Sequence, residues 1–255
     1  MAGRLEGKVC VVTGASGGIG AATVEAFQRE GARVAGVDLR EGAPGDLALA
    51  VDVTEESAVE QMYAQVREAF GRIDVLFNNA GISPDDDASV LETGLDAWQR
   101  VQDVNLKSVF LCCKHGIPHL LENDAPHRGS VINTASFVAT LGAATSQISY
   151  TASKGGVLAL SRELGVEFAR QGVRVNALSP GPVDTPLLRE LFAKDPEKAA
   201  RRLVHVPMGR FARAEEMANA VVFLGSDESS FITAANFLVD GGISGAYVTP
   251  LGDAL

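Results

Sequence analysis

The chain has few cysteines and histidines and no long apolar run. Its 255 residues include three cysteines, Cys10, Cys112 and Cys113, and four histidines. An odd cysteine count favours reduced, buried thiols over a disulfide framework. The scattered histidines show no metal-ligand spacing, so we expect no metal site. No apolar run is long enough to span a membrane and the chain does not start with a signal peptide pattern, so we predict a cytoplasmic protein without a membrane partner.

Basic residues are also scarce. The 22 Lys and Arg residues are outnumbered by 32 Asp and Glu residues, which gives a net charge of −10. This balance argues against a non-specific nucleic-acid binder, because nucleic acid is itself an anion. The one dense acidic run, Asp85-Asp86-Asp87, is expected to form a solvent-exposed turn.

Short apolar runs rich in Val and Ile alternate with longer segments of helical pattern. Runs that are apolar throughout predict strands buried on both faces. Strand and helix in turn predict right-handed βαβ units. We therefore predict an α/β fold, one Rossmann-type domain over 1–255 with a doubly wound parallel sheet of seven strands in the order 3-2-1-4-5-6-7. The expected strands are Lys8–Thr13, Arg33–Asp38, Leu47–Val53, Ile73–Asn78, Ser130–Thr134, Val173–Leu178 and Asn236–Val239, and helices begin near Gly18, Glu55, Ala97, Tyr150, Pro186 and Ala214.

A charged, amphipathic segment, Leu187–Val206, follows the break at Pro180-Gly181-Pro182. Its position after the carboxyl end of a strand favours a substrate lid at 187–206 over an ordinary pair of surface helices. Arg201, Arg202 and His205 could meet an anionic group there, but a solvated helix face is the favoured interpretation.

A Gly-rich turn, Thr13–Gly20, joins the first predicted strand to the first helix. Glycine allows a close approach of the backbone to a phosphate, and a helix N-terminus offers free N–H groups to a pyrophosphate. The spacing Gly-x-x-x-Gly-x-Gly departs from the commoner Gly-x-Gly-x-x-Gly. In a βαβ context it predicts a dinucleotide site. The expected contacts in this turn are Gly14, Ser16, Gly17, Gly18 and Ile19.

The same turn also matches Gly-x-Ser-x-Gly, the pattern of a serine-hydrolase nucleophile elbow. An elbow needs a developed sheet before it, and here one strand precedes, so Ser16 is not expected to be a nucleophile.

Acidic residues at two strand ends predict how the nucleotide is held. Asp38 lies 18 residues beyond Gly20 and can accept hydrogen bonds from both ribose hydroxyls while repelling a 2′-phosphate. Arg40 could favour the phosphate, but Asp38 is nearer the strand end, which predicts NAD over NADP. Asp52 could reach the adenine, with Val53 packed on it, or could cap the helix that follows.

Further polar residues follow other strands at the same edge. Asn79, Ala80 and Gly81 end the fourth predicted strand and let a ligand lie close. Ser136 ends the fifth and could hold a substrate oxygen. Tyr150 and Lys154 are four residues apart on a predicted helix and so share one face. An ammonium beside a phenol lowers its pKa, which makes Tyr150 a candidate general base for an alcohol.

Taken together and in this order, these motifs resemble the short-chain dehydrogenase/reductase family over nearly the whole chain. Further matching segments are Pro207–Phe211 and Asp240–Gly242. The resemblance implies a catalytic tetrad of Asn105, Ser136, Tyr150 and Lys154, with Asn105 carrying a relay water. It also implies a homotetramer built partly on the Tyr150 helix. The cofactor contacts that it implies, besides Tyr150 and Lys154, are Pro180, Gly181, Val183 and Thr185, the last near the nicotinamide amide. One departure is the 14-residue spacing from Ser136 to Tyr150, where many members have 13.

The sequence thus predicts an NAD-dependent oxidoreductase of a secondary alcohol or its ketone. Two alternatives stay open: an NADPH-dependent reductase of 3-oxoacyl groups on acyl-carrier protein, and a non-catalytic NAD-binding protein. The substrate itself is not readable. The expected pocket residues are Ser83, Phe137, Val138, Gln147, Pro182 and parts of 187–206.

Overall fold

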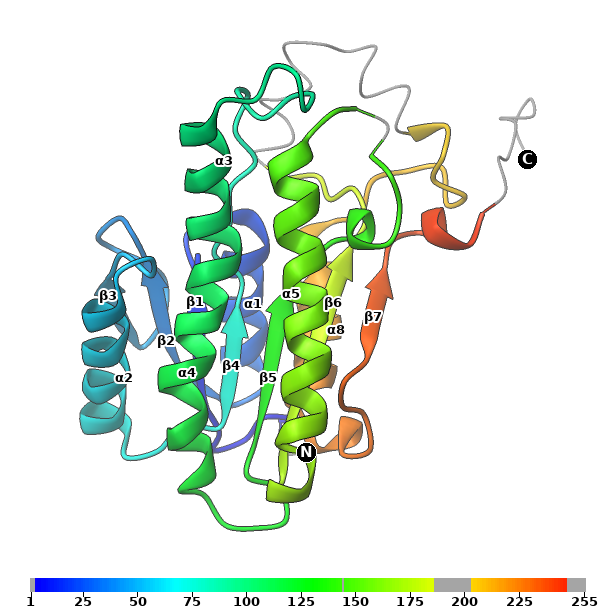
Figure 1. The fold of residues 1–255 in the computed structure, drawn as a ribbon. Coiled ribbons are helices and arrows are strands. Elements are labelled where there is room, and N and C mark those ends of the chain that lie inside the picture. The colour runs from blue at the N-terminus through cyan, green and yellow to red at the C-terminus, as the bar shows by residue number, and fades with distance from the viewer. Residues whose placement is uncertain (1–2, 144, 186–202, 247–255) are drawn as a thin grey trace.

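The computed structural model describes residues 3–143, 145–185 and 203–246. Their strands form one parallel sheet in the order β3-β2-β1-β4-β5-β6-β7, which confirms the predicted topology. Figure 1 shows the strands side by side with their carboxyl ends at one edge. The strands are β1 Val9–Thr13, β2 Arg33–Asp38, β3 Leu47–Ala50, β4 Val75–Asn78, β5 Gly129–Thr134, β6 Val173–Pro180 and β7 Asn236–Val239.

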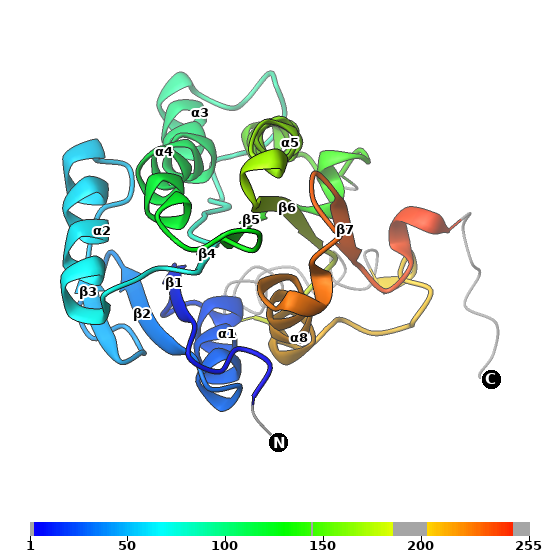
Figure 2. The ribbon, with the colours of Figure 1, turned by 90° about the horizontal axis from the view of Figure 1, so that it is seen from below.

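Helices cover both faces of the sheet, as the view from below shows (Figure 2). On one face lie α2 Glu56–Phe70, α4 Ser108–Leu121 and α5 Ile148–Glu167, and on the other lie α1 Gly18–Arg29 and α8 Ala214–Gly225. Each layer has its own apolar core against the strands. The central strands, β1 and β4 among them, are buried at every position, as expected for a sheet covered on both sides.

The two edge strands differ from this expectation. In β3 partly buried and exposed residues alternate, and no residue of β7 is fully buried. An edge strand has a neighbour on one side alone, so an apolar run does not by itself ensure burial. β3 also ends at Ala50, three residues before the predicted end at Val53, and β4 begins at Val75 and not at Ile73.

The segment between β4 and β5 is longer and less regular than the single predicted helix near Ala97. Helix α3 covers Leu95–Gln102, a π-helical turn follows at Asp103–Lys107, and α4 continues from Ser108. Such turns inside helices often accompany functional sites. This one contains Asn105, a predicted member of the tetrad.

The cysteines lie in the core as predicted. Cys10 on β1 and Cys112 and Cys113 on α4 are free and buried. Burial raises the pKa of all three thiols, that of Cys113 to about 12. They are therefore expected to be inert packing groups.

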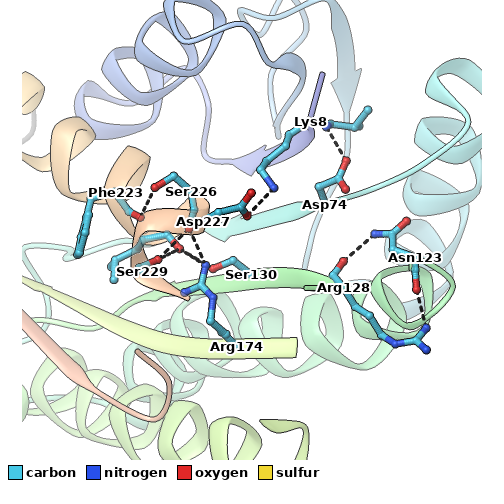
Figure 3. Close-up of polar contacts among 12 residues, drawn as sticks. Lys8, Asp74, Asn123, Arg128, Ser130, Arg174, Phe223, Ser226, Asp227 and Ser229 are labelled. Atoms are coloured by element: carbon cyan, nitrogen blue, oxygen red, sulfur yellow. Dashed lines mark hydrogen bonds and ion pairs between the residues drawn. The ribbon is translucent and has the colours of Figure 1, made fainter. Parts of the chain in front are cut away.

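At the amino edge of the sheet, polar contacts join the strands to the segment that follows α8 (Figure 3). The guanidinium of Arg174 on β6 donates to the carbonyl oxygens of Leu224 and Ser226, at 2.8 and 3.1 Å. These carbonyls end α8 and have no partner inside the helix. Burial lowers the pKa of Arg174 to about 10. Arg174 thus joins the end of α8 to the sheet at the amino edge. Sheets of this class bind ligands at the opposite edge, where the strands have their carboxyl ends. No helix in the described ranges is long and apolar enough to cross a membrane.

Candidate active site

The Gly-rich turn is joined to the end of β4 by hydrogen bonds. The hydroxyl of Thr13 accepts the N–H groups of Asn79 and Ala80, at 3.0 and 3.2 Å. The side-chain amide of Asn79 donates to the carbonyls of Thr13 and Gly14, at 3.2 and 3.3 Å. Two segments predicted to contact the cofactor therefore form one surface at the carboxyl edge.

Two glycines of this turn have different reasons to be glycine. Gly14 has φ +65°, and a Cβ there would lie 2.9 Å from the Cα of Ala80, so the fold requires it. Gly17 is exposed, has an ordinary φ of −76°, and would bring a Cβ no nearer to the protein than 3.3 Å. At 17, the N-cap of α1, the fold demands a glycine less strongly than at 14, although a Cβ would stand close to Gly14 O. An open backbone there fits a phosphate at the helix N-terminus.

Asp38 at the end of β2 faces the same turn. Its Oδ2 accepts the N–H of Ser16 at 3.0 Å, and its side chain is 13% exposed. Arg40 is 76% exposed, and its Nε lies 3.7 Å from Asp38 Oδ1. The carboxylate is thus fixed beside the Gly-rich turn, while the guanidinium projects into solvent.

The side chain of Asp52 forms a local turn before helix α2 and does not cap the helix, whose N-cap is Glu55. Asp52 Oδ1 accepts both the N–H and the hydroxyl of Thr54, at 2.9 and 2.7 Å. Asp52 is exposed two residues beyond the end of β3, and Val53 is buried in the core. The contact of either residue with an adenine stays a prediction.

Tyr150 and Lys154 lie on successive turns at the start of α5. The Lys154 Nζ is 5.6 Å from the centre of the Tyr150 ring. It donates to the carbonyl of Thr134, at the end of β5, at 2.7 Å. Lys154 is 3% exposed, and this burial lowers its pKa to about 8. The predicted helical pairing is therefore present, with the amine fixed against the sheet edge.

Asn105 is fully buried and its side chain is engaged by the protein. Its Oδ1 accepts the N–H of Ile82 at 2.8 Å, and its Nδ2 donates to Ile82 O and Ser153 Oγ, at 2.9 and 3.1 Å. A Cβ on Gly81 would stand 3.3 Å from Asn105 Oδ1 and 3.4 Å from Lys154 Nζ. Asn105, Lys154 and Gly81 therefore meet at one point of the edge.

Ser136 lies on the β5 side of the same edge. Its hydroxyl accepts the N–H of Val138 at 3.4 Å and so caps a short 3₁₀ helix, Phe137–Ala139. This 3₁₀ helix packs against α5. Ser136 is 5% exposed, so its hydroxyl is held at the sheet edge on the side of the Tyr150 helix.

The burial of Asp87 contradicts the prediction that Asp85, Asp86 and Asp87 form a solvent-exposed turn. Its neighbour Asp86 does pair with Arg100 at the surface, but Asp87 is 6% exposed. Its two carboxylate oxygens accept the backbone N–H groups of Ser149 and Tyr150, at 2.9 and 2.8 Å. Sequence spacing could not reveal this contact, because the partners are 62 and 63 residues apart.

The last predicted cofactor residues follow β6. Gly181 donates to Val239 O at 3.0 Å, and Val183 forms an isolated parallel bridge with Ala212. Thr185 donates its N–H to Val183 O at 2.8 Å. This short segment runs from Pro180, the last residue of β6, to Thr185. Most of the predicted lid at 187–206, with Arg201 and Arg202, lies outside the described residues; His205 is exposed.

The parallel sheet with helices on both faces and the Gly-rich turn at its carboxyl edge define a protein of the Rossmann type. Residues 14–244 match the family model described as enoyl-(acyl carrier protein) reductase. The chain belongs to the short-chain dehydrogenase/reductase family, as predicted, and the similar proteins named below are dehydrogenases and reductases that act on CH–OH groups.

Characterised relatives span several chemistries. The chain is 41% identical to the cis-4-hydroxycyclohexanecarboxylate dehydrogenase of Sinomonas cyclohexanicum, over 92% of this chain and 96% of that one. It is 38% identical to the 3-oxoacyl-[acyl-carrier-protein] reductase FabG of Thermotoga maritima, over 94% and 99%. The ligand-free aldohexose dehydrogenase of Thermoplasma acidophilum superposes with a TM-score of 0.88 at 31% identity, over 99% of this chain and 100% of that one.

Proposed function

We propose that this protein is an NAD-dependent dehydrogenase of a secondary alcohol, or a reductase of the matching ketone, with Tyr150 as general base and acid. The observation that carries the proposal is the Tyr150–Lys154 pair, with Lys154 Nζ 5.6 Å from the phenol ring, at the edge where the Gly-rich turn lies. A phenol near an ammonium favours phenolate and can accept a hydroxyl proton.

The remaining residues of the tetrad have roles in this scheme that their contacts support. Ser136 holds the substrate oxygen as its charge changes, an electrostatic contribution often worth about 3 kcal/mol. Lys154 lowers the Tyr150 pKa and binds the ribose of the cofactor. Bound NAD supplies the hydride acceptor, and the protein supplies position and electrostatic field.

Asn105 holds the loop at Ile82 and the helix at Ser153 in fixed positions. In the proton relay implied by the family resemblance, a water at Asn105 links Lys154 to solvent. Because the side-chain amide is engaged by Ile82 and Ser153, the proposed relay uses the main-chain carbonyl of Asn105 in its π-helical turn.

The choice of NAD over NADP is supported by Asp38. A carboxylate fixed at the ribose end of the Gly-rich turn accepts hydrogen bonds from a ribose diol and repels a 2′-phosphate. The competing candidate is an NADPH-dependent 3-oxoacyl-carrier-protein reductase, which the similarity to the Thermotoga reductase favours. The third candidate function is a non-catalytic NAD-binding role. This role gives no reason for the buried, desolvated amine of Lys154 beside a phenol.

A homotetrameric assembly in the cytoplasm stays part of the proposal. It rests on the family resemblance, and the assembly would bury apolar side chains that the outer helices expose, such as Phe110 of α4 at 50% and Val166 of α5 at 69%.

A panel of alcohols tested with NAD and with NADP, followed by the absorbance of the reduced nicotinamide, tests this function. The proposal expects secondary alcohols to be oxidised with NAD, and at a lower kcat/KM with NADP. Reduction of a 3-oxoacyl thioester with NADPH, without oxidation of any alcohol by NAD, would favour the competing reductase. Tight NAD binding with no turnover in either direction would favour the non-catalytic role.

A further inference from the structure

The catalytic helix α5 receives its N-terminal cap from a distant segment. A helix leaves its first N–H groups without partners inside the helix. The residue at the N-cap of α5, Gln147, makes no side-chain cap hydrogen bond. Instead, Asp87 accepts the N–H groups of Ser149 and Tyr150, and Ala88 O accepts the N–H of Ile148 at 3.3 Å.

These contacts fall on the catalytic residue itself. One oxygen of Asp87 is bonded to the backbone N–H of Tyr150 at 2.8 Å, and the carboxylate is nearly excluded from solvent. Hydrogen bonds to charged groups are roughly twice as strong as neutral ones. A carboxylate at a helix N-terminus is also stabilised by the helix dipole.

The same loop holds the cofactor side of the site. It starts at Asn79 and Ala80, which are bonded to Thr13 beside the Gly-rich turn, and it is bonded to Asn105 at Ile82. Asp87 closes the loop onto α5. One continuous segment, residues 79–88, therefore spans from the predicted cofactor surface to the backbone of Tyr150.

We infer that Asp87 is a positioning residue for hydride transfer: its carboxylate fixes the first turn of α5, and with it the Tyr150 phenol, relative to the cofactor surface. The inference rests on the proposed function, because it takes Tyr150 as the general base. A misplacement of about 1 Å can lower a rate about 100-fold, so a single capping group can affect catalysis without touching the substrate.

Asp87→Asn tests the inference, because asparagine keeps the shape but has one acceptor oxygen for two N–H groups. The alcohol that wild type oxidises fastest with NAD is used as substrate. We expect kcat to fall at least about tenfold, with KM and NAD affinity within about twofold. The deuterium isotope effect on kcat should rise, because a misplaced base slows the chemical step. Asp86→Asn is the matched control, since Asp86 is the adjacent residue and pairs with Arg100 at the surface; it should leave all four quantities unchanged.

A merely structural role predicts a different outcome. Partial unfolding lowers kcat through the active fraction and leaves the isotope effect at its wild-type value, and that result would overturn the inference. Asp87→Ser is a second, smaller neutral variant with one acceptor oxygen. It tests whether the effect comes from the loss of the carboxylate and not from the asparagine that replaces it. Loss of the folded circular-dichroism spectrum in both variants would assign Asp87 to folding alone and would also contradict the inference.

A second measurement needs no substrate. Hydrogen exchange at the Ser149 and Tyr150 amides should accelerate in Asp87→Asn and not in Asp86→Asn. If the exchange rates of these two amides are unchanged in Asp87→Asn, the inference is overturned, whether or not the proposed function is correct. Conversely, if Tyr150→Phe remains active, the proposed function fails while the exchange result still reports on the cap.

Discussion

The amine of Lys154 lies 5.6 Å from the centre of the Tyr150 ring and is bonded to the carbonyl of Thr134. Burial lowers the pKa of the Lys154 amine to about 8, so the amine loses its positive charge as the pH rises through about 8. If Tyr150 and Lys154 interact as the proposed function requires, they titrate as a pair, and the midpoint of a rate profile belongs to both. The proposed function therefore makes activity depend on pH through both groups, and the burial of Lys154 makes stability depend on pH.

Lys154→Met keeps most of the side-chain volume and removes the charge. The pH–rate midpoint of oxidation should move upward, because a nearby ammonium favours phenolate and the variant lacks it. NAD affinity should also fall through the lost ribose contact. A kcat/KM profile of wild type and variant at equal salt measures the shift. An unshifted midpoint would remove Lys154 from the mechanism.

Stability gives a second measure of the same buried amine. The folded-state pKa of about 8 lies below the ordinary 10.5, so between these values the unfolded chain binds more protons. Stability contributed by Lys154 should therefore rise with pH across this window, by about 3 kcal/mol at most. Denaturant unfolding of wild type and Lys154→Met is compared at both ends of the window, and the difference in unfolding free energy between the two proteins, wild type minus variant, should rise with pH. The buried thiols, whose raised pKa values act in the opposite direction, contribute equally to both proteins and cancel in this difference. Parallel curves would mean that the amine is better solvated than its burial indicates.

Asp38→Ala should weaken NAD binding and relax selectivity toward NADP. The ribose diol loses a charged acceptor, worth about 1.5–3 kcal/mol, or roughly tenfold or more in Kd. The repulsion of a 2′-phosphate is lost as well. Titration with both cofactors measures the change, and Arg40→Ala, in an exposed side chain two residues on, should leave NAD affinity near wild type. A wild type that already prefers NADP by kcat/KM would contradict this role of Asp38.

Gly17→Ala should reduce NAD affinity about tenfold with little loss of stability. Position 17 has ordinary backbone angles, and a methyl group there would lie 3.3 Å from Gly14 O, a tight contact that a small shift relieves, so the methyl mainly obstructs a phosphate. At an N-cap the change from glycine to alanine costs about 1 kcal/mol or less. Gly14→Ala is the contrasting variant, because φ is +65° there and backbone lies 2.9 Å away; it should lower the melting temperature. Unchanged NAD affinity in Gly17→Ala would move the phosphate site elsewhere.

Much of the fold was predictable because it depends on local patterns. The strand order follows from alternating apolar runs and helices. Gly31, just past the end of α1, has φ +86°, the conformation in which a glycine commonly ends a helix. Residues directly after strands, such as Asn79 and Ser136, were predictable because parallel strands bring their carboxyl ends to one edge.

What the sequence could not reveal depends on contacts between distant segments. Asp87 looks like part of an acidic surface run, and its burial is decided by the N–H groups of α5. The π-helical turn at Asn105 has no signature in a helical pattern, since the residues on either side continue the helix. The exposure of β3 follows from its place at the edge of the sheet, which an apolar run of four residues does not record.

The central claim is that the Tyr150 phenol transfers the proton in an NAD-dependent alcohol oxidation. Tyr150→Phe removes the hydroxyl and keeps the ring that packs beside Lys154. The direct measurement is turnover of an accepted alcohol by this variant, with NAD affinity measured in the same preparation by titration. The account predicts that turnover is lost by at least about 100-fold while NAD affinity stays near wild type. Turnover within tenfold of wild type would contradict it.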